Sequence, residues 1–221
     1  TLLRRAPNGY YAWWIRPQIA ARALAGSPDA GPPLVTPAIA APSSVPASRA
    51  QLDDLHRRVR LLAAIDQVDE AATELEVAER AVGPDPEILE EMALLGEWPR
   101  TVKMARRLAD AGHPVRQDLL YPDPFRREME HAAATTGMDP ILLTSIARQE
   151  SLFDPNARSP AGAIGLLQLM PATAADLAGR PVPITELVDP ARSAELGARE
   201  LRRHLERYDG RLVLAIAAYN A

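Results

Sequence analysis

Glycine and proline divide the middle of this sequence into segments that are each long enough for only a short helix. Between residues 48 and 114, apolar residues recur every three or four positions, and Gly83-Pro84, Gly96 and Gly112 interrupt the pattern. Apolar residues at this spacing line one face of an α-helix, whereas Gly and Pro end helices. The predicted helices span 48–66, 68–82, 86–95 and 99–111. Short helices joined by tight turns bury their apolar faces on one another, so we expect a stack of helical hairpins.

Composition excludes several other kinds of protein. The 221-residue chain is 47% hydrophobic, but it contains no uninterrupted apolar run of the length needed to cross a membrane. The net charge of −4 is spread evenly, so neither half has the basic excess that nucleic-acid binding requires. The chain has no cysteine, and its four histidines lack metal-ligand spacing. We therefore expect no nucleic-acid partner, no transmembrane segment, no metal and no cofactor.

Prolines also mark the expected domain organisation. Residues 26–48 contain six prolines among Ala, Ser and Gly, which predicts an extended connector. Tyr121-Pro122-Asp123-Pro124 favours extended backbone before each proline, so we interpret it as a domain joint. The predicted domains are 1–120, a helical scaffold region that includes the connector, and 121–221. Aromatic residues at 10–15 are expected to pack a helix in the scaffold, although a sugar-stacking platform is the alternative.

An acid occupies an apolar position near the end of one predicted helix in the second domain. Asp139-Pro140 is a favourable helix start, and the helix is expected to run to residue 150 or 151. Leu143 and Ile146 lie on an apolar stripe whose next position is Glu150. Burial disfavours the charged form of a carboxyl group, so we expect a raised pKa for Glu150. A protonated acid suits the first step of glycoside cleavage, whereas the alternative is a Glu that turns to water where the helix frays.

A glycine-containing turn follows this helix. Residues 159–165 read Ser-Pro-Ala-Gly-Ala-Ile-Gly and cannot continue a helix, and Pro171 opens a second predicted helix that ends at 178. This arrangement can bring Ser159 and Gln168 near the end of the helix that carries Glu150. Beyond it, the sequence predicts a loop at 185–189, a helix at 190–208, and a last helix at 212–219. The last helix is apolar almost throughout, so we expect it to be buried.

Three short motifs occur in order in this second domain. They are Glu150-Ser151, then Gly165-Leu166-Leu167-Gln168-Leu169-Met170-Pro171, then Ala218-Tyr219-Asn220. Together they resemble the signature stretches of the soluble lytic transglycosylase family, with Leu167 where the family commonly has Met, a swap that packed sites tolerate. The resemblance implies a mainly α fold, with a superhelical scaffold followed by a lysozyme-like catalytic domain. Family members usually continue beyond Ala-Tyr-Asn, so we expect this domain to be truncated at its C-terminus.

The resemblance also implies an activity and roles for particular residues. It implies cleavage of the β-1,4 bond between N-acetylmuramic acid and N-acetylglucosamine in peptidoglycan glycan strands, with a 1,6-anhydromuramoyl product. Glu150 would act first as acid and then as base. Tyr219 would orient Glu150, although its hydroxyl could instead be satisfied by nearby backbone. The residues that would bind substrate or shape its site are Ser151, Ser159, Gly165, Gln168, Met170, Tyr219 and Asn220.

Two other functions remain open from the sequence. A hydrolase of the goose-lysozyme kind would need a second carboxylate to position water, and Asp154, four residues after Glu150, is more naturally a turn residue. A non-catalytic peptidoglycan-binding scaffold is the other alternative. The family implies a periplasmic or cell-envelope location. No signal peptide is visible and the chain begins at Thr1, which we interpret as a mature or excised fragment.

Overall fold

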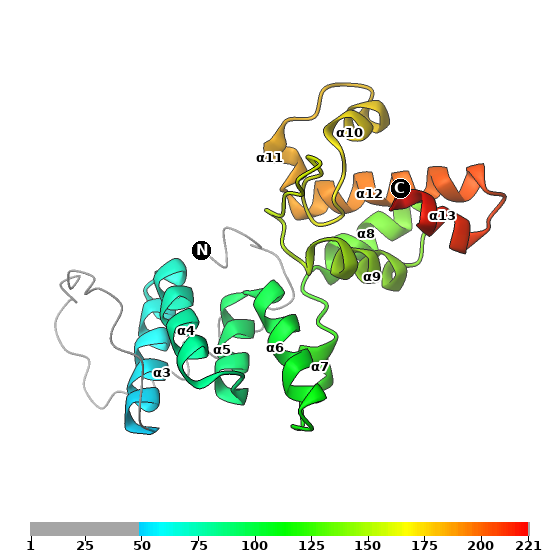
Figure 1. The fold of residues 1–221 in the computed structure, drawn as a ribbon. Helices are drawn as coiled ribbons and strands as arrows, with labels where there is room; N and C mark the ends of the chain where they lie inside the picture. Colours follow the sequence, from blue (N-terminus) through cyan, green and yellow to red (C-terminus); the bar gives the residue numbers. More distant parts are fainter. Residues whose placement is uncertain (1–48, 221) are drawn as a thin grey trace. The chain divides into compact units, whose positions relative to one another are not determined.

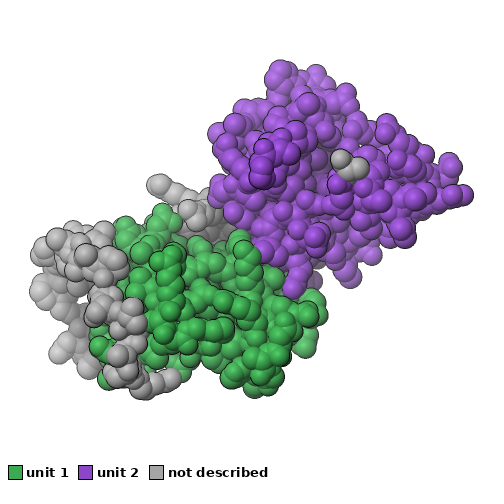
Figure 2. Space-filling view, viewed as in Figure 1, with its two compact units in different colours: residues 1–122 green, residues 123–221 purple. Residues whose placement is uncertain are grey.

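The computed structural model describes residues 49–220, and within them all regular structure is helical. The predicted connector at 26–48 and the aromatic segment at 10–15 lie outside the described residues. The chain divides into two compact units, Thr1–Pro122 and Asp123–Ala221 (Figure 2). The division falls within the Tyr-Pro-Asp-Pro segment that the sequence analysis interprets as a domain joint.

The first unit is a stack of helices that pack in chain order (Figure 1). Each helix turns its apolar stripe inward, as with Leu55 and Val59 of the first helix, which are each 2% exposed. The interior is filled by residues such as Leu75, Ile88 and Met104. The helices are α3 (Arg49–Ala64), α4 (Val68–Val82), α5 (Pro86–Leu95), α6 (Trp98–Asp110) and α7 (Gln117–Leu120). The prediction of a stack of short helices in this region is therefore confirmed.

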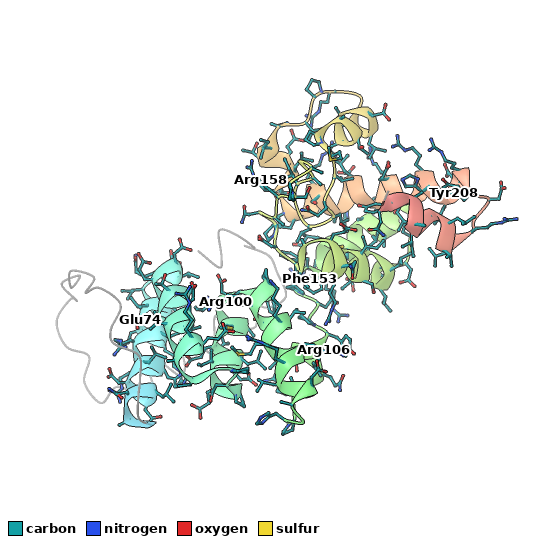
Figure 3. All side chains as sticks on the ribbon, viewed as in Figure 1. Glu74, Arg100, Arg106, Phe153, Arg158 and Tyr208 are labelled. Carbon is teal, nitrogen blue, oxygen red and sulfur yellow. The ribbon has the colours of Figure 1, made fainter. Side chains whose placement is uncertain are left out.

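Polar contacts tie the helices of this stack together. Arg100 of α6, labelled in Figure 3, donates to the Ala72 carbonyl of α4 at 3.2 Å and to Glu79 at 3.1 Å. His56 of α3 lies 2.8 Å from Glu91 of α5, through Nδ1 and Oε2. Both of these residues are buried, so the pair forms a polar bridge between two helices inside the apolar stack.

The second unit is arranged around one long helix, α12 (Pro190–Arg207). Asp189 begins it by accepting a hydrogen bond from the Arg192 amide at 2.8 Å, and Pro190 occupies the first helical position. Small residues such as Gly197 and Ala198 lie on its buried face, which lets other segments approach closely. The elements that pack on α12 are α8 (Arg126–Thr136), α10 (Pro171–Ala178), α11 (Ile184–Leu187) and α13 (Leu212–Tyr219), as Figure 1 shows.

Two expectations about the end of the chain are wrong. The segment predicted as a loop at 185–189 contains a single helical turn, α11, whose Leu187 is fully buried against α12 and anchors it. The last helix, α13, is largely exposed rather than buried: Val213 is 80% exposed, and Leu212 and Leu214 are each 42% exposed. This eight-residue helix packs on α12 through a single stripe that contains Ala215. A uniformly apolar sequence has no periodicity that could reveal which face is covered.

Candidate active site

Glu150 lies near the end of α9 (Pro140–Ser151), which has the predicted bounds. Asp139 caps the helix by accepting from the Ile141 amide at 2.8 Å, and Leu143 and Ala147 are completely buried on the predicted apolar stripe. Glu150 follows on that stripe and is half-buried. Burial raises the pKa of its carboxyl group, as predicted. Within residues 49–220, no hydrogen bond or ion pair holds this carboxyl group, so no partner favours its charged form.

The backbone turns sharply directly after Glu150-Ser151. Leu152 and Phe153 both adopt left-handed conformations, with φ of 51° and 68°. This region is unfavourable for side chains with a Cβ atom, and each such residue costs about 1 to 2 kcal/mol. Phe153, labelled in Figure 3, is only 1% exposed, so its burial offsets the cost. The end of the helix that carries the acid is thus held in a strained shape by the packing beneath it.

The second motif forms a tight turn that packs closely against α11 and α12. Gly165 has φ of 86°, and a Cβ atom at this position would lie 2.2 Å from the Leu187 carbonyl oxygen and 2.9 Å from Ser193 Oγ. Only glycine fits here, for both conformational and steric reasons. The sequence analysis expected backbone at Gly165 to pass near substrate. The close approach in the structure is to the neighbouring backbone, and the substrate contact stays a prediction.

Side chains from all three motifs hold three consecutive carbonyl groups of this turn. Gln168 Nε2 donates to the Gly165 carbonyl at 2.9 Å. Ser151 Oγ lies 2.9 Å from the Leu166 carbonyl oxygen and shares its proton with the Ala147 carbonyl at 3.0 Å. The Tyr219 hydroxyl donates to the Leu167 carbonyl at 2.8 Å. The motifs, which are far apart in the sequence, therefore meet at one short stretch of backbone next to Glu150.

These bonds limit what two of the predicted substrate-binding residues can do. Gln168 Nε2 also donates to the Ala157 carbonyl at 3.1 Å, so both of its amide protons are used by backbone and only its oxygen remains for a sugar group. The single hydroxyl proton of Tyr219 goes to Leu167, which matches the alternative that nearby backbone satisfies it. Burial, and then the charge of Glu150, raise the pKa of Tyr219, so the acid lies within electrostatic range of this hydroxyl.

The remaining predicted site residues make local contacts outside the 165–167 turn. Ser159 Oγ accepts a hydrogen bond from the Ala163 amide at 3.0 Å. Asn220 Nδ2 donates to the Ile216 carbonyl at 3.0 Å at the end of α13. Met170 is 41% exposed just before α10, so its side chain is accessible. Among residues 49–220, no hydrogen bond links these three side chains to the turn that Ser151, Gln168 and Tyr219 hold.

Sequence reasoning missed the contribution of α12 to this site. Leu167 packs on Gly197 so closely that a Cβ atom there would lie 2.3 Å from Leu167 Cδ1. The Leu167 amide donates to Ser193 Oγ at 3.4 Å. A glycine inside a long helical pattern was the available signal, because such a glycine often permits close packing. The turn is therefore fixed by α12 on one side and by the motif side chains on the other.

Comparison with known proteins finds relatives that share the second unit of this chain. The model of the transglycosylase SLT domain matches residues 128–221. The membrane-bound lytic murein transglycosylase F of Alcanivorax borkumensis is 39% identical over 107 residues, which cover 46% of this chain and 21% of that protein. The soluble lytic murein transglycosylase of Escherichia coli K12 is 36% identical over 111 residues, covering 47% of this chain and 16% of that protein.

Solved structures agree with these relatives. An inactive mutant of the lytic transglycosylase Slt from Pseudomonas aeruginosa aligns with a TM-score of 0.59 and 28% identity, over 82% of this chain and 30% of that one. The 70 kDa soluble lytic transglycosylase from Escherichia coli aligns with a TM-score of 0.60 and 21% identity, over 100% of this chain and 34% of that one, and supports the fold. The chain thus spans only a minor part of each of these proteins. The matched residues contain all three motifs and the turn that they hold, so residues 128–221 are similar to the transglycosylase SLT domain in both sequence and local geometry.

Proposed function

We propose that this chain contains the acid–base site of a peptidoglycan lytic transglycosylase. The substrate is the β-1,4 bond between N-acetylmuramic acid and N-acetylglucosamine, and the product carries a 1,6-anhydromuramoyl end. The observation that carries the proposal is Glu150, a half-buried acid with a raised pKa and no partner among residues 49–220. A general acid has to remain protonated near neutral pH, and burial is a known way to achieve this.

Glu150 serves both steps of the proposed reaction. Its protonated carboxyl group donates the proton to the glycosidic oxygen as the bond to C1 of the muramoyl residue breaks. The resulting carboxylate then removes the proton from the 6-hydroxyl group of the same sugar as that oxygen forms a bond to C1. Glu150 is protonated again at the end, and no water is consumed. One carboxyl group is sufficient for this cycle, in contrast to glycosidases that use a pair.

The turn at 165–167 supports this chemistry by fixing the backbone beside the acid. Hydrogen bonds from Gln168, Ser151 and Tyr219 satisfy its three carbonyl groups, so the turn does not need water or substrate for its own stability. Preorganised polar groups lower the cost of aligning a substrate with a catalytic group. In this proposal, Ser159, Met170 and Asn220 line the sugar-binding region, and the free oxygen of Gln168 can accept a hydrogen bond from a sugar hydroxyl or amide.

A hydrolase of the goose-lysozyme kind receives less support. Asp154 is the acid that follows Glu150 most closely in the sequence, and its Oδ1 accepts a hydrogen bond from the Asn156 amide at 2.8 Å. Such a bond is typical of an Asp that stabilises a turn. Burial raises the pKa of Glu150, and no second acid contributes to that shift among residues 49–220. This observation favours the single-acid reaction.

The proposed place of action is the peptidoglycan of the cell envelope. In residues 49–220, no helix has the length and apolar character needed to cross a membrane. The relatives include proteins named as soluble and as membrane-bound lytic murein transglycosylases. A periplasmic location for this chain is part of the proposal.

Mass analysis of products released from purified peptidoglycan tests the proposal. We expect anhydromuropeptides from this chain or from a version extended beyond Ala221, and their loss in Glu150→Gln. Glu206→Gln is the matched control, because Glu206 is an exposed acid of α12 that pairs with Arg202 at 2.7 Å. Reducing-end products would assign a hydrolase. Retained binding to peptidoglycan with no soluble product from any form would assign the non-catalytic scaffold.

A further inference from the structure

Two ionisable side chains on α12 face the interior of the second unit. Both are far from Glu150 in the sequence. Glu200 is 7% exposed and His204 is 9% exposed. They are four residues apart and therefore lie on the same face of the helix. Burying groups of this kind is costly unless they are paired. Their position requires a physical explanation that the three motifs do not provide.

Glu200 and His204 belong to a connected polar network. His204 Nε2 lies 3.0 Å from Glu200 Oε1, and Arg203 lies 2.7 Å from Glu200 Oε2. Arg203 also reaches Asp176 of α10 at 2.6 Å, so the network links two helices. His204 Nδ1 is buried and has no hydrogen-bond partner among residues 49–220. A proton on Nδ1 would have no acceptor, so we assign the proton of the neutral ring to Nε2, where it is donated to Glu200.

The network ends at the ring of Tyr219. The His204 and Tyr219 rings meet edge to face, with centroids 6.4 Å apart and an interplanar angle of 71°. Aromatic pairs favour this arrangement, in which the positive edge of one ring faces the negative face of the other. The charges of both Glu150 and Glu200 raise the pKa of Tyr219, so both acids lie within electrostatic range of its hydroxyl. Tyr219 therefore remains a neutral phenol that always has a proton to donate.

Tyr219 connects the position of its ring to the turn beside Glu150 through a hydrogen bond. Its hydroxyl donates to the Leu167 carbonyl at 2.8 Å, and the preceding carbonyl, of Leu166, is held by Ser151 directly after Glu150. The ring lies on α13, a short helix whose residues are mostly half-buried or exposed. The contact with His204 gives the ring a neighbour on the long helix α12.

We propose that His204, held by Glu200, is a positioning residue that fixes the Tyr219 ring and thereby the turn beside Glu150. The inference rests on the proposed function, because its expected effect on the cleavage rate acts through Glu150. It concerns a contact between α12 and α13 rather than any contact with substrate. Arg203, which also pairs with Asp176, completes the arrangement by holding the Glu200 side chain in place.

The test separates the ring contact from the hydrogen bond. His204→Ala removes both, His204→Phe keeps a ring against Tyr219, and His204→Gln keeps a side-chain donor without a ring. Met129→Ala is the stability control, because Met129 is a buried apolar residue of α8 that takes no part in the polar network of Glu200 and His204. The first readout is the carbonyl ¹³C shift of Leu167 in labelled protein, calibrated by Tyr219→Phe. We expect His204→Ala to reproduce most of the Tyr219→Phe shift, His204→Phe little of it, and Met129→Ala none.

The second readout is cleavage of soluble glycan oligomers prepared from peptidoglycan. We expect kcat to fall about tenfold in His204→Ala with KM nearly unchanged, and to recover substantially in His204→Phe but not in His204→Gln. An unchanged Leu167 shift in His204→Ala would overturn the inference, as would equal effects of Ala and Phe. If no form of the protein cleaves the oligomers, the proposed function fails, while the Leu167 shift still decides whether His204 positions the turn.

Discussion

Glu91 in the first unit and Glu150 in the second are both acids on the inward side of a helix, but only Glu91 has partners. Glu91 is 3% exposed, and its two oxygens meet His56 at 2.8 Å and Arg60 at 3.0 Å. Glu150 is half-buried, and no side chain among residues 49–220 pairs with it. Burial without a partner favours the protonated form of a carboxyl group, and it raises the pKa of Glu150. The difference separates an acid that connects helices from an acid that can donate.

A glycine from each unit shows a second contrast, which concerns the atoms that surround it. Gly112, which follows α6, has φ of 84°, and a Cβ atom there would meet nothing within 4 Å. Gly165 has a similar φ of 86°, but a Cβ atom there would lie 2.2 Å from a backbone oxygen. In the first unit the glycine only permits a backbone conformation. In the second it also permits the close packing that places the turn beside Glu150.

Exchange of each acid for its amide gives the largest expected contrast. Glu150→Gln should reduce product release about a thousandfold, because the proton donor is lost. Its unfolding free energy should stay the same or rise, since an unpaired buried carboxyl group is removed. Glu91→Gln should instead lower the unfolding free energy by about 2 kcal/mol, through weaker hydrogen bonds to charged partners, and leave cleavage per folded molecule unchanged. Product analysis measures cleavage, and urea unfolding measures stability. Loss of stability in Glu150→Gln with loss of cleavage in Glu91→Gln would contradict the roles assigned to the two acids.

Alanine substitution of each glycine tests the second comparison. Gly165→Ala should cost about 3 kcal/mol or more, because the backbone must move to relieve the contact and the conformation is unfavourable for alanine. Gly112→Ala should cost only about 1 kcal/mol, for conformation alone. Denaturant unfolding of the unit that carries each change provides the measurement. Equal costs would mean that the turn is loosely packed.

Removal of the Tyr219 hydroxyl should have a smaller effect on stability. Tyr219→Phe leaves the Leu167 carbonyl without its donor, which should cost about 1 kcal/mol. Tyr208→Phe, at the end of α12, is the matched control and should change the unfolding free energy by less than about 0.5 kcal/mol. A Tyr219→Phe protein as stable as the control would show that the hydrogen bond contributes nothing to the turn.

The smallest predicted effect is the pH dependence of the first unit. The hydrogen bond that His56 donates to Glu91, opposed by burial, raises the pKa of His56 above its ordinary value of 6.5. A raised folded-state pKa stabilises the protein below pH 6.5, and this contribution is lost as the pH rises through the folded-state value. Urea unfolding at pH 5.5 and pH 8.5 should therefore show a loss of stability that His56→Gln reduces. An identical loss in the variant would assign the dependence to other groups.

Features that depend on a local sequence pattern could be predicted from the sequence. The apolar stripe of α9, its Asp139-Pro140 start and the burial of Glu150 follow from residues within three turns of one helix. The use of Gln168 could not be predicted, and for Tyr219 the sequence left backbone as one alternative without identifying the acceptor, because backbone carbonyls are present in every residue. The exposure of α13 was missed because its uniformly apolar sequence gives no preferred face. His204 belongs to no sequence motif, and only the three-dimensional structure brings it to Tyr219.

The most direct test of the account is a carboxyl ¹³C NMR titration of Glu150 in the folded protein. The account predicts a pKa above the ordinary Glu value of 4.5, because burial without a partner disfavours the carboxylate. The same titration in urea-unfolded protein should return the ordinary value and provides the reference. A folded-state pKa at or below 4.5 would contradict the account, because burial would then not favour the protonated form of Glu150.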